Sequence, residues 1–228
     1  MHGNLHKYFL NNGSKKRIHK LLHYFDIYES NFERFRNKSI TVLEIGVHGG
    51  GSLCMWKDYF GAECQVIGLD INPECKQHEA KGIEIFIGSQ DDADVLDEIH
   101  AKYPVIDIVI DDGSHMSSQM IASFELLYPR LAENGVYLVE DTCCCYWDEY
   151  GGGLKRDNTF IEYAKNKIDE MQASANLTQV REVTRSGPNT LPVTDFMRTT
   201  DSVSFYDSII VFTKRRQARR EQLVTTPM

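Results

Sequence analysis

Long hydrophobic runs are absent from the 228-residue sequence. No window approaches the roughly 18 consecutive apolar residues of a membrane-spanning helix. The first 20 residues, MHGNLHKYFLNNGSKKRIHK, lack the apolar block of a secretory signal peptide. We therefore expect a cytoplasmic protein without membrane insertion.

Cysteines with metal-binding spacing are also lacking. Cys143, Cys144 and Cys145 are adjacent, which suits neither a zinc site nor an ordinary disulfide, and the other three are isolated. Without an export signal, all six are expected to be reduced thiols. We interpret them as packing or loop residues.

An excess of positive charge is missing too, because the net charge is -8. General nucleic-acid binding is therefore not expected, although five basic residues lie between Lys214 and Arg220. Repeats, low-complexity segments and linkers are not evident. We expect one main domain at 40–214, preceded by a helical extension at 1–39, and we interpret 215–228 as a flexible basic tail.

Short apolar runs alternate with amphipathic ones from residue 40 onward, as in strand–helix units around a parallel sheet. Strands are predicted at 40–46, 65–70, 83–88, 105–111 and 135–140, and helices at 52–60, 73–81, 92–102, 117–132 and 157–172. Alternating residues at 177–185 and 202–214 predict a closing antiparallel pair. Residues 15–35 resemble a helix that could cover a site or contact another subunit. The expected fold class is α/β, a doubly wound, mostly parallel, seven-stranded Rossmann-like sheet.

The first glycine-rich loop, EIGVHGGGSL, follows the first predicted strand, where such folds bind ligands. Gly46 and Gly49 allow tight turns, and Ser52 could cap the following helix. His48 stands where the dinucleotide fingerprint requires its second glycine, which disfavours a pyrophosphate cradle.

Two carboxylates flank this loop. Asp70, at the end of the second strand, can accept hydrogen bonds from ribose hydroxyls. Glu44, just before the glycines, would repel a diphosphate and attract an ammonium or sulfonium group. S-adenosylmethionine meets these demands better than NAD.

Four more acids close the fourth and fifth predicted strands: Asp111 and Asp112, then Glu140 and Asp141. Neighbouring parallel strands are about 4.8 Å apart, so these carboxylates can converge. A site of oxygen ligands suits Mg²⁺ first, with Mn²⁺ or Ca²⁺ behind it. The alternative is that the acids cap the helices that follow.

His115 lies three residues after Asp112 and can reach the same volume. A hydroxyl group attacks a methyl sulfonium only if a base takes its proton, and histidine titrates near neutral pH. We therefore regard His115 as the candidate general base. Tyr146, Trp147 and Tyr150 could contact an acceptor, but core packing is an equally good use for them.

The segments VLEIGVHGGGSLCMW, VIGLDINPE, IDIVIDDGSHM and LAENGVYLVEDTCCCYW together resemble the class I S-adenosylmethionine-dependent methyltransferases. Within that class the chain is most similar to the metal-dependent macrolide sugar O-methyltransferases, from about residue 10 to residue 170. The resemblance implies Mg²⁺ ligands at Asp112, Glu140 and Asp141 and a base at His115. The neighbouring Asp111 is the alternative to Asp112 as a ligand, or it faces the cofactor instead. The implied cofactor-binding set is Glu44, Gly46, Gly49, Ser52, Asp70, Ile71, Ser89, Gln90, Asp91 and Asp111.

The resemblance also implies a glycosylated small molecule or glycan as acceptor, and a homo-oligomer. Relatives carry polar residues where this chain has Cys143–Cys145, so acceptor recognition is expected to differ there. Rival hypotheses are a catechol-like phenol O-methyltransferase, an NAD-linked oxidoreductase, a non-catalytic nucleotide-binding module and a cephalosporin-hydroxylase-like protein.

Overall fold

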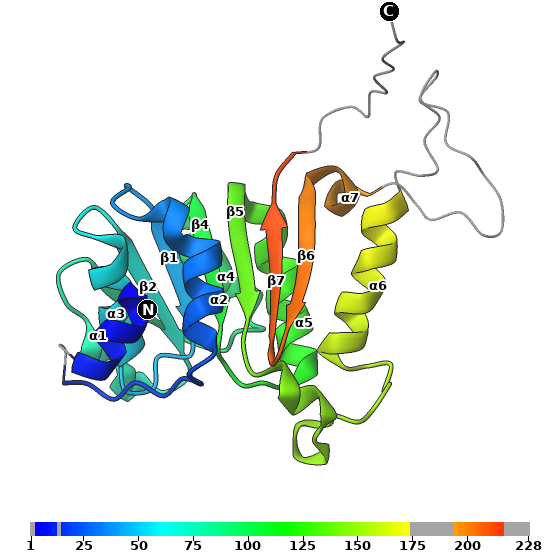
Figure 1. Ribbon diagram of the computed structural model, residues 1–228, viewed down its shortest axis with the longest axis horizontal. Coiled ribbons are helices and arrows are strands. Elements are labelled where there is room, and N and C mark those ends of the chain that lie inside the picture. Colours follow the sequence, from blue (N-terminus) through cyan, green and yellow to red (C-terminus); the bar gives the residue numbers. More distant parts are fainter. Residues whose placement is uncertain (1–2, 13–14, 174–193, 217–228) are drawn as a thin grey trace, which may run out of the picture.

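A single seven-stranded sheet organises the computed structural model, which describes residues 3–12, 15–173 and 194–216. The strand order is β3-β2-β1-β4-β5-β7-β6. Five strands are parallel: β1 (Thr41–Ile45), β2 (Gln65–Asp70), β3 (Ile83–Ile87), β4 (Ile106–Asp111) and β5 (Leu131–Val139). The predicted doubly wound α/β fold is confirmed (Figure 1).

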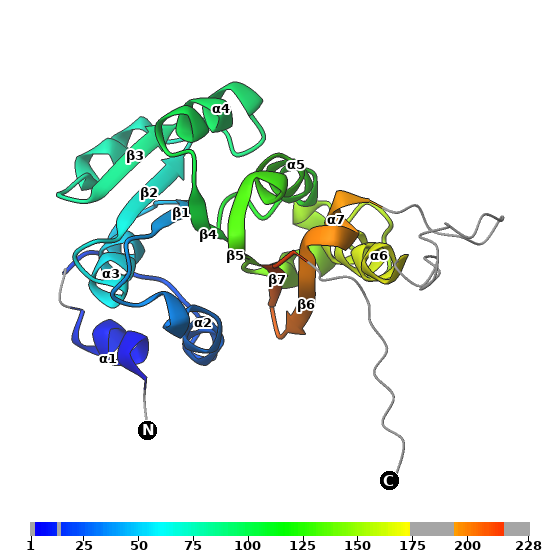
Figure 2. The same ribbon diagram turned by 90° about the horizontal axis from the view of Figure 1, so that it is seen from above.

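Helices cover both faces of this sheet (Figure 2). One face carries α1 (Asn4–Asn11), α2 (Tyr24–Phe32) and α3 (Gly51–Phe60), and the other carries α4 (Ala93–Lys102), α5 (Ser117–Leu127) and α6 (Phe160–Gln172). The near-continuous Val, Ile and Leu runs of the parallel strands supply a core on each side. No helix in the described part of the chain has the length and apolar character needed to cross a membrane.

The strand order reverses at β1, which pairs with β2 on one side and β4 on the other. In an open parallel sheet this reversal opens a crevice beyond the carboxyl ends of the strands. The loops after β1, β2, β4 and β5 meet there, so the fold brings the predicted site residues to one edge.

The C-terminal strands form an antiparallel hairpin, as predicted, but one predicted run supplies both. β6 (Thr200–Tyr206) and β7 (Ile209–Lys214) turn at 207–208, and β7 pairs antiparallel with β5. A short helix, α7 (Asp195–Thr199), precedes them. The strand predicted at 177–185 and most of the tail at 215–228 lie outside the described residues.

Three predicted helices differ from the structure. Residues 73–81 contain only a 3-10 helix, η2 (Pro73–His78). The helix predicted to reach 132 ends at Leu127, because Pro129 occupies the next 3-10 turn, η3 (Tyr128–Arg130), and β5 starts at Leu131. Three further 3-10 turns are η1 (Glu33–Phe35), η4 (Thr142–Tyr146) and η5 (Asp148–Tyr150).

The third difference concerns the N-terminal segment. Residues 15–35 were predicted as one helix, but α2 begins only at Tyr24, and residues 15–23 contain no helix or strand. We call residues 15–23 the strap. It runs along the edge where the parallel strands end, from the end of α1 to the start of α2 (Figure 1).

Candidate active site

The acidic residues after β4 and β5 lie side by side. Asp111 is aligned with Val139 in the parallel pair, so Asp112 and Glu140 follow at neighbouring strand ends. Successive side chains of a strand point to opposite faces, which separates Asp111 from Asp112.

Asp111 turns into the interior and is 1% exposed. It accepts hydrogen bonds from Gln90 at 3.1 Å, from Ser123 at 2.7 Å and from the Tyr137 hydroxyl at 3.3 Å. Burial raises its pKa to about 6, and these donors oppose that rise. Asp111 therefore braces the loop after β3 against α5.

Asp112, His115 and Asp141 form the cluster best suited to an ion. Each offers one ligand atom, and these atoms all lie within 4.8 Å of one another. His115 Nε2 is 4.0 Å from Asp112 Oδ1 and 3.7 Å from Asp141 Oδ2. The two carboxylates supply the oxygen ligands that a hard divalent cation prefers, so Asp112 and Asp141 fit Mg²⁺ or Mn²⁺, with His115 beside them.

Backbone strain marks two members of this cluster. His115 has φ of 59° and Asp141 has φ of 51°. Residues other than glycine pay of order 1 kcal/mol or more to hold such left-handed conformations, and these accumulate at functional sites. These strained conformations lower the stability of the fold but orient both side chains toward the same volume.

Glu140 is adjacent to the cluster but is not a member of it. Its side chain is 1% exposed, and Oε2 accepts a hydrogen bond of 2.9 Å from Lys20. Among the described residues, Oε1 has no hydrogen-bond partner. Burial and the charge of Asp112 raise the pKa of Glu140. A buried, unpartnered oxygen is costly, which fits an additional cation, although ligation by Glu140 stays a prediction.

Lys20 is a positively charged residue of the site that the sequence analysis did not predict. Its ammonium lies 2.5 Å from Asp112 Oδ2, 2.9 Å from Glu140 Oε2 and 3.5 Å from Glu44 Oε1. The side chain is only 2% exposed. Burial lowers its pKa, but the three carboxylates outweigh that effect and raise the pKa above its ordinary value.

Tyr24 is a second unpredicted contact. Its hydroxyl donates to Asp141 Oδ1 at 2.6 Å, and burial together with this carboxylate raises the pKa of Tyr24. The first residue of α2 thereby holds one carboxylate of the cluster.

A cavity of about 190 Å³ adjoins the acidic cluster at the carboxyl ends of β1, β2 and β3. Five predicted cofactor residues line it: Gly46, Asp70, Ile71, Ser89 and Gln90. Gly113 and Ser114, the two residues between Asp112 and His115, line it as well. The cavity and the candidate metal cluster are therefore linked through one loop.

Asp70 organises the first glycine loop. Oδ2 accepts hydrogen bonds from the backbone N–H groups of Val47 at 2.8 Å and His48 at 3.0 Å, and Oδ1 accepts one from Asn72 at 2.9 Å. Burial raises the pKa of Asp70, but these donors outweigh it and lower the pKa overall. Asp70 also lines the cavity, next to the loop that it holds.

Apolar and polar groups complete this cavity. Ile71 is 73% exposed and offers an apolar surface at its rim, where a purine ring could pack. Gln119, from α5, lines the wall and donates to Asp91 at 3.2 Å, so predicted residue Asp91 lies behind that wall. Gly46 has φ of 92°, and a side chain there would overlap the carbonyl of Asp112.

Five predicted cofactor residues do not line the cavity: Glu44, Gly49, Ser52, Asp91 and Asp111. Glu44 is fully buried and accepts a hydrogen bond of 2.8 Å from Ser52. Ser52 therefore binds Glu44 instead of capping α3, whose N-cap is Gly50. A direct cofactor contact by these five stays a prediction.

The aromatic residues after β5 lie near His115. Tyr146 and Trp147 are 42% and 48% exposed, and the ring centroid of Tyr150 is 6.1 Å from that of His115. Cys144 and Cys145 are buried, and all six cysteines are free thiols, consistent with packing. The exposed rings remain available for an acceptor.

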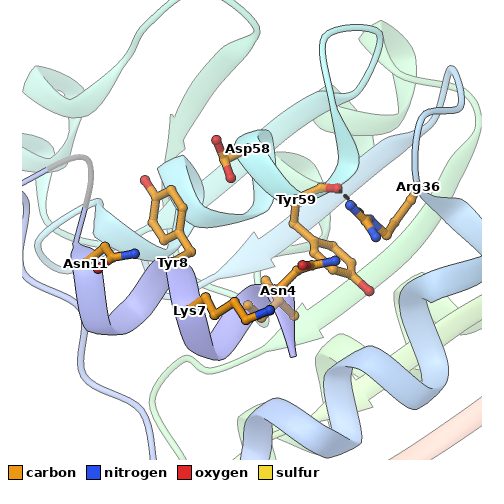
Figure 3. A pocket seen from close by; sticks show the side chains of 8 residues that line it. Asn4, Lys7, Tyr8, Asn11, Arg36, Asp58 and Tyr59 are labelled. Carbon is orange, nitrogen blue, oxygen red and sulfur yellow. Dashed lines mark hydrogen bonds between the residues drawn. The ribbon is translucent and has the colours of Figure 1, made fainter. Parts of the chain in front are cut away.

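A second cavity, of about 400 Å³, lies between α1 and the end of α3. Figure 3 shows Lys7, Tyr8, Asp58 and Tyr59 around it. No predicted site residue lines this cavity, so the candidate active site is the acidic edge.

Two kinds of signal separate the residues that the sequence identified from those it missed. The acids and His115 follow directly after strands, where the fold places ligands. Lys20 and Tyr24 lie in the segment 15–35. Its helix-like spacing of residues gave no indication that residues 15–23 would reach the acidic cluster. A lone lysine beside two leucines, KLL, was the only local sign of an unusual position.

Comparison with known proteins agrees with this geometry. Residues 43–142 match a family model described as a methyltransferase domain. The demethylmacrocin O-methyltransferase of Streptomyces fradiae is 39% identical over 163 residues, which are 66% of this chain and 40% of that protein. The 8-demethyl-8-alpha-L-rhamnosyl tetracenomycin-C 2'-O-methyltransferase of Streptomyces olivaceus is 36% identical over 200 residues, which are 84% of this chain and 50% of that protein.

A solved methyltransferase from the mycinamycin biosynthetic pathway, in complex with Mg, SAH and mycinamycin VI, has a TM-score of 0.79 and 30% identity. The match covers 94% of this chain and 54% of the solved chain. The present chain thus spans about half the length of the relatives it matches.

Proposed function

The chain contains a methyltransferase domain homologous to those of antibiotic-pathway sugar O-methyltransferases, and we propose that it methylates a sugar hydroxyl with S-adenosylmethionine. The acceptor is a glycosylated small molecule or a glycan. The observation that carries this proposal is one loop, Asp112–His115, whose ends belong to the acidic cluster and whose middle lines the nucleoside-sized cavity.

In this proposal Asp70 and the walls of the cavity hold the nucleoside of the cofactor. Ile71 would pack against the purine, and Ser89 and Gln90 form part of the cavity wall beside it. Gly46 lines the cavity and lies against Asp112, so the bound cofactor would supply its methyl group next to the acidic cluster.

Asp112 and Asp141 hold the ion, with Glu140 as the third carboxylate. A bound Mg²⁺ would supply the positive charge that stabilises the acceptor oxygen as its proton leaves. Tyr24 fixes the orientation of Asp141 by its hydrogen bond of 2.6 Å. These residues, with the ion that they would hold, would keep the acceptor next to the cofactor, which lowers the entropic cost of the reaction.

His115 accepts the proton of the acceptor hydroxyl. Its Nε2 lies 4.0 Å from Asp112 Oδ1 and 3.7 Å from Asp141 Oδ2, so the base stands beside the residues that would hold the ion. Tyr150 packs against the ring, and Trp147 and Tyr146 form an apolar surface for the C–H faces of the acceptor.

Calorimetric titration of the purified protein with S-adenosylmethionine, NAD and Mg²⁺ tests the cofactor. Binding of S-adenosylmethionine and Mg²⁺ without NAD is expected, and no binding of S-adenosylmethionine would overturn the proposal. Methyl transfer is then measured by mass spectrometry on glycosylated macrolides and on simple catechols. Transfer to catechols alone would replace the sugar acceptor by a phenol.

The homo-oligomeric state and the cytoplasmic location expected from the sequence belong to the same proposal. Sedimentation of the purified protein gives the subunit number directly, and a monomer at working concentration would remove that part.

A further inference from the structure

The strap, residues 15–23, has the reverse of the usual exposure pattern. The Lys20 side chain is 2% exposed, whereas Leu21 and Leu22, which follow it, are 43% and 61% exposed. Burying a charge while exposing two leucines is unfavourable unless the charge is strongly paired. The acidic cluster, and not a hydrophobic core, therefore decides where this part of the chain lies.

Alternate residues of the strap face the protein. From 15 to 20 the exposure alternates strictly, with Lys16, Ile18 and Lys20 on the inner side. Lys16 donates to the carbonyl of His78 at 3.3 Å, and Ile18 packs against the core beneath α3. An extended segment has this period of two, so the strap is laid on the protein as a strand would be, without a partner strand.

The strap also lies directly against the glycine loop. A side chain on Gly51 would overlap the carbonyl of Arg17 and the side chain of Ile18. Glycine is therefore needed at this last position of the loop, because the strap leaves no room for a side chain there. The same segment thus covers the loop at 46–51 and reaches the acids with its lysine.

Lys20 binds one oxygen of each of two carboxylates and leaves the other oxygen of each. It binds Asp112 through Oδ2 and Glu140 through Oε2. Asp112 Oδ1 faces His115, and Glu140 Oε1 has no hydrogen-bond partner among the described residues. An ion bound beside His115 can use these second oxygens while Lys20 keeps the first.

We propose that Lys20 is a positioning residue that stays in place beside the ion, orients Asp112 and Glu140 toward it and fastens the strap over the cofactor loop. The same side chain also lies 3.5 Å from Oε1 of Glu44, the carboxylate just before the glycine loop, and so links that loop to the acidic cluster. The inference concerning the ion and the cofactor rests on the proposed function, but the fastening of the strap does not.

Limited trypsin digestion of the free protein tests the fastening. Cleavage after Arg17 requires the strap to leave the surface, so Lys20→Met is expected to accelerate it at least about tenfold, because a broken buried ion pair leaves uncompensated charge. Lys20→Arg should retain protection, since it keeps the positive charge. Lys16→Met is the matched control, because it removes a strap lysine whose ammonium donates to the carbonyl of His78.

Calorimetry on the same variants tests positioning. Lys20→Met should weaken binding of both Mg²⁺ and S-adenosylhomocysteine by roughly tenfold, while Lys20→Arg restores most of each affinity. If Lys20→Met does not fold, Lys20→Met/Glu44→Gln removes one charge of each sign and is expected to show the same loss of protection.

Adding Mg²⁺ to the wild-type protein tests whether Lys20 stays in place when the ion binds or is displaced by it. Protection of the strap should be unchanged or increased by the ion. Faster cleavage after Arg17 on adding Mg²⁺ would mean that ion and ammonium exclude each other, and this overturns the proposal. Unchanged cleavage in Lys20→Met also overturns it, whereas wild-type protein that binds no cofactor contradicts the proposed function and leaves the fastening result intact.

Discussion

The hydroxyl of Tyr24 donates a hydrogen bond of 2.6 Å to Oδ1 of Asp141, across 117 residues of sequence. The other oxygen of Asp141, Oδ2, lies 3.7 Å from His115 Nε2. Helix α2 thus binds Oδ1 of Asp141 through Tyr24, while Oδ2 faces His115 in the cluster. Asp141 has a left-handed backbone, so the hydrogen bond also helps to fix a strained residue.

Replacing Tyr24 by Phe is expected to weaken Mg²⁺ binding by about three- to tenfold, because loss of one orienting contact behind a metal ligand lowers affinity at or below the 10–100-fold scale typical of such partners. The ring stays, so the melting temperature should change little. Calorimetric titration with Mg²⁺ measures the effect. Tyr59→Phe, in the second cavity, is the control, and equal losses in both variants would contradict a specific role for Tyr24.

Replacing His115 by Ala should lower the rate of methyl transfer by about 10²- to 10⁴-fold, the range for loss of a general base. Affinity for S-adenosylhomocysteine should stay nearly constant, because His115 does not line the cofactor cavity. Transfer is followed by mass spectrometry and affinity by calorimetry. His48→Ala serves as control, and a variant that loses affinity but keeps its rate would make His115 a binding residue.

The fold and the main acids were predictable because both follow from local patterns. Buried strands read as runs of Val, Ile and Leu, and a parallel sheet gathers their carboxyl ends at one edge. Asp112, His115 and Asp141 each follow such an end within four residues. Their convergence needed only strand adjacency and no detailed packing.

The strap was not predictable by the same means. Its apolar and basic residues have helical spacing, but the position of Lys20 is set by acids 24, 92 and 120 residues away in the sequence. Long-range charge pairing overrode local propensity there. The split between Asp111 and Asp112 also depended on the exact end of β4, and the structure places Asp111 in the interior with Gln90 and Ser123.

Asp70→Asn should destabilise the fold by about 2 kcal/mol at neutral pH, because charge-assisted bonds from three backbone N–H groups are weakened. The donors lower the pKa of Asp70 in the folded state, so this contribution is complete above its unfolded pKa of about 3.9 and declines as the pH falls through the folded value. Urea unfolding at several pH values measures it. The difference between wild type and variant should shrink below about pH 4, and a difference independent of pH would contradict the assignment.

Gly51→Ala tests the contact between the glycine loop and the strap without altering a charge. The added methyl group overlaps the carbonyl of Arg17, so the strap must shift, and the cost expected for such overpacking is about 1–3 kcal/mol. Trypsin should then cleave after Arg17 faster, as in Lys20→Met. Gly153→Ala is the matched control, because its methyl group would lie 3.5 Å from the nearest side-chain atom, an ordinary contact. A protected strap in Gly51→Ala would show that the loop can yield instead.

Asp112→Asn and Asp111→Asn separate two neighbouring acids with opposite roles. Asp112→Asn removes a carboxylate of the cluster and should lower Mg²⁺ affinity at least about tenfold, because the replacement is a neutral and weaker ligand for a hard cation. Asp111→Asn should leave Mg²⁺ affinity within about threefold but lower stability by roughly 1–3 kcal/mol, since an amide group faces donors from Gln90 and Ser123. Calorimetry and urea unfolding measure the two effects on the same samples. If Asp111→Asn abolished Mg²⁺ binding while Asp112→Asn did not, the ion would lie on the α5 face of the sheet, and the cluster of Asp112, His115 and Asp141 would lose its proposed role.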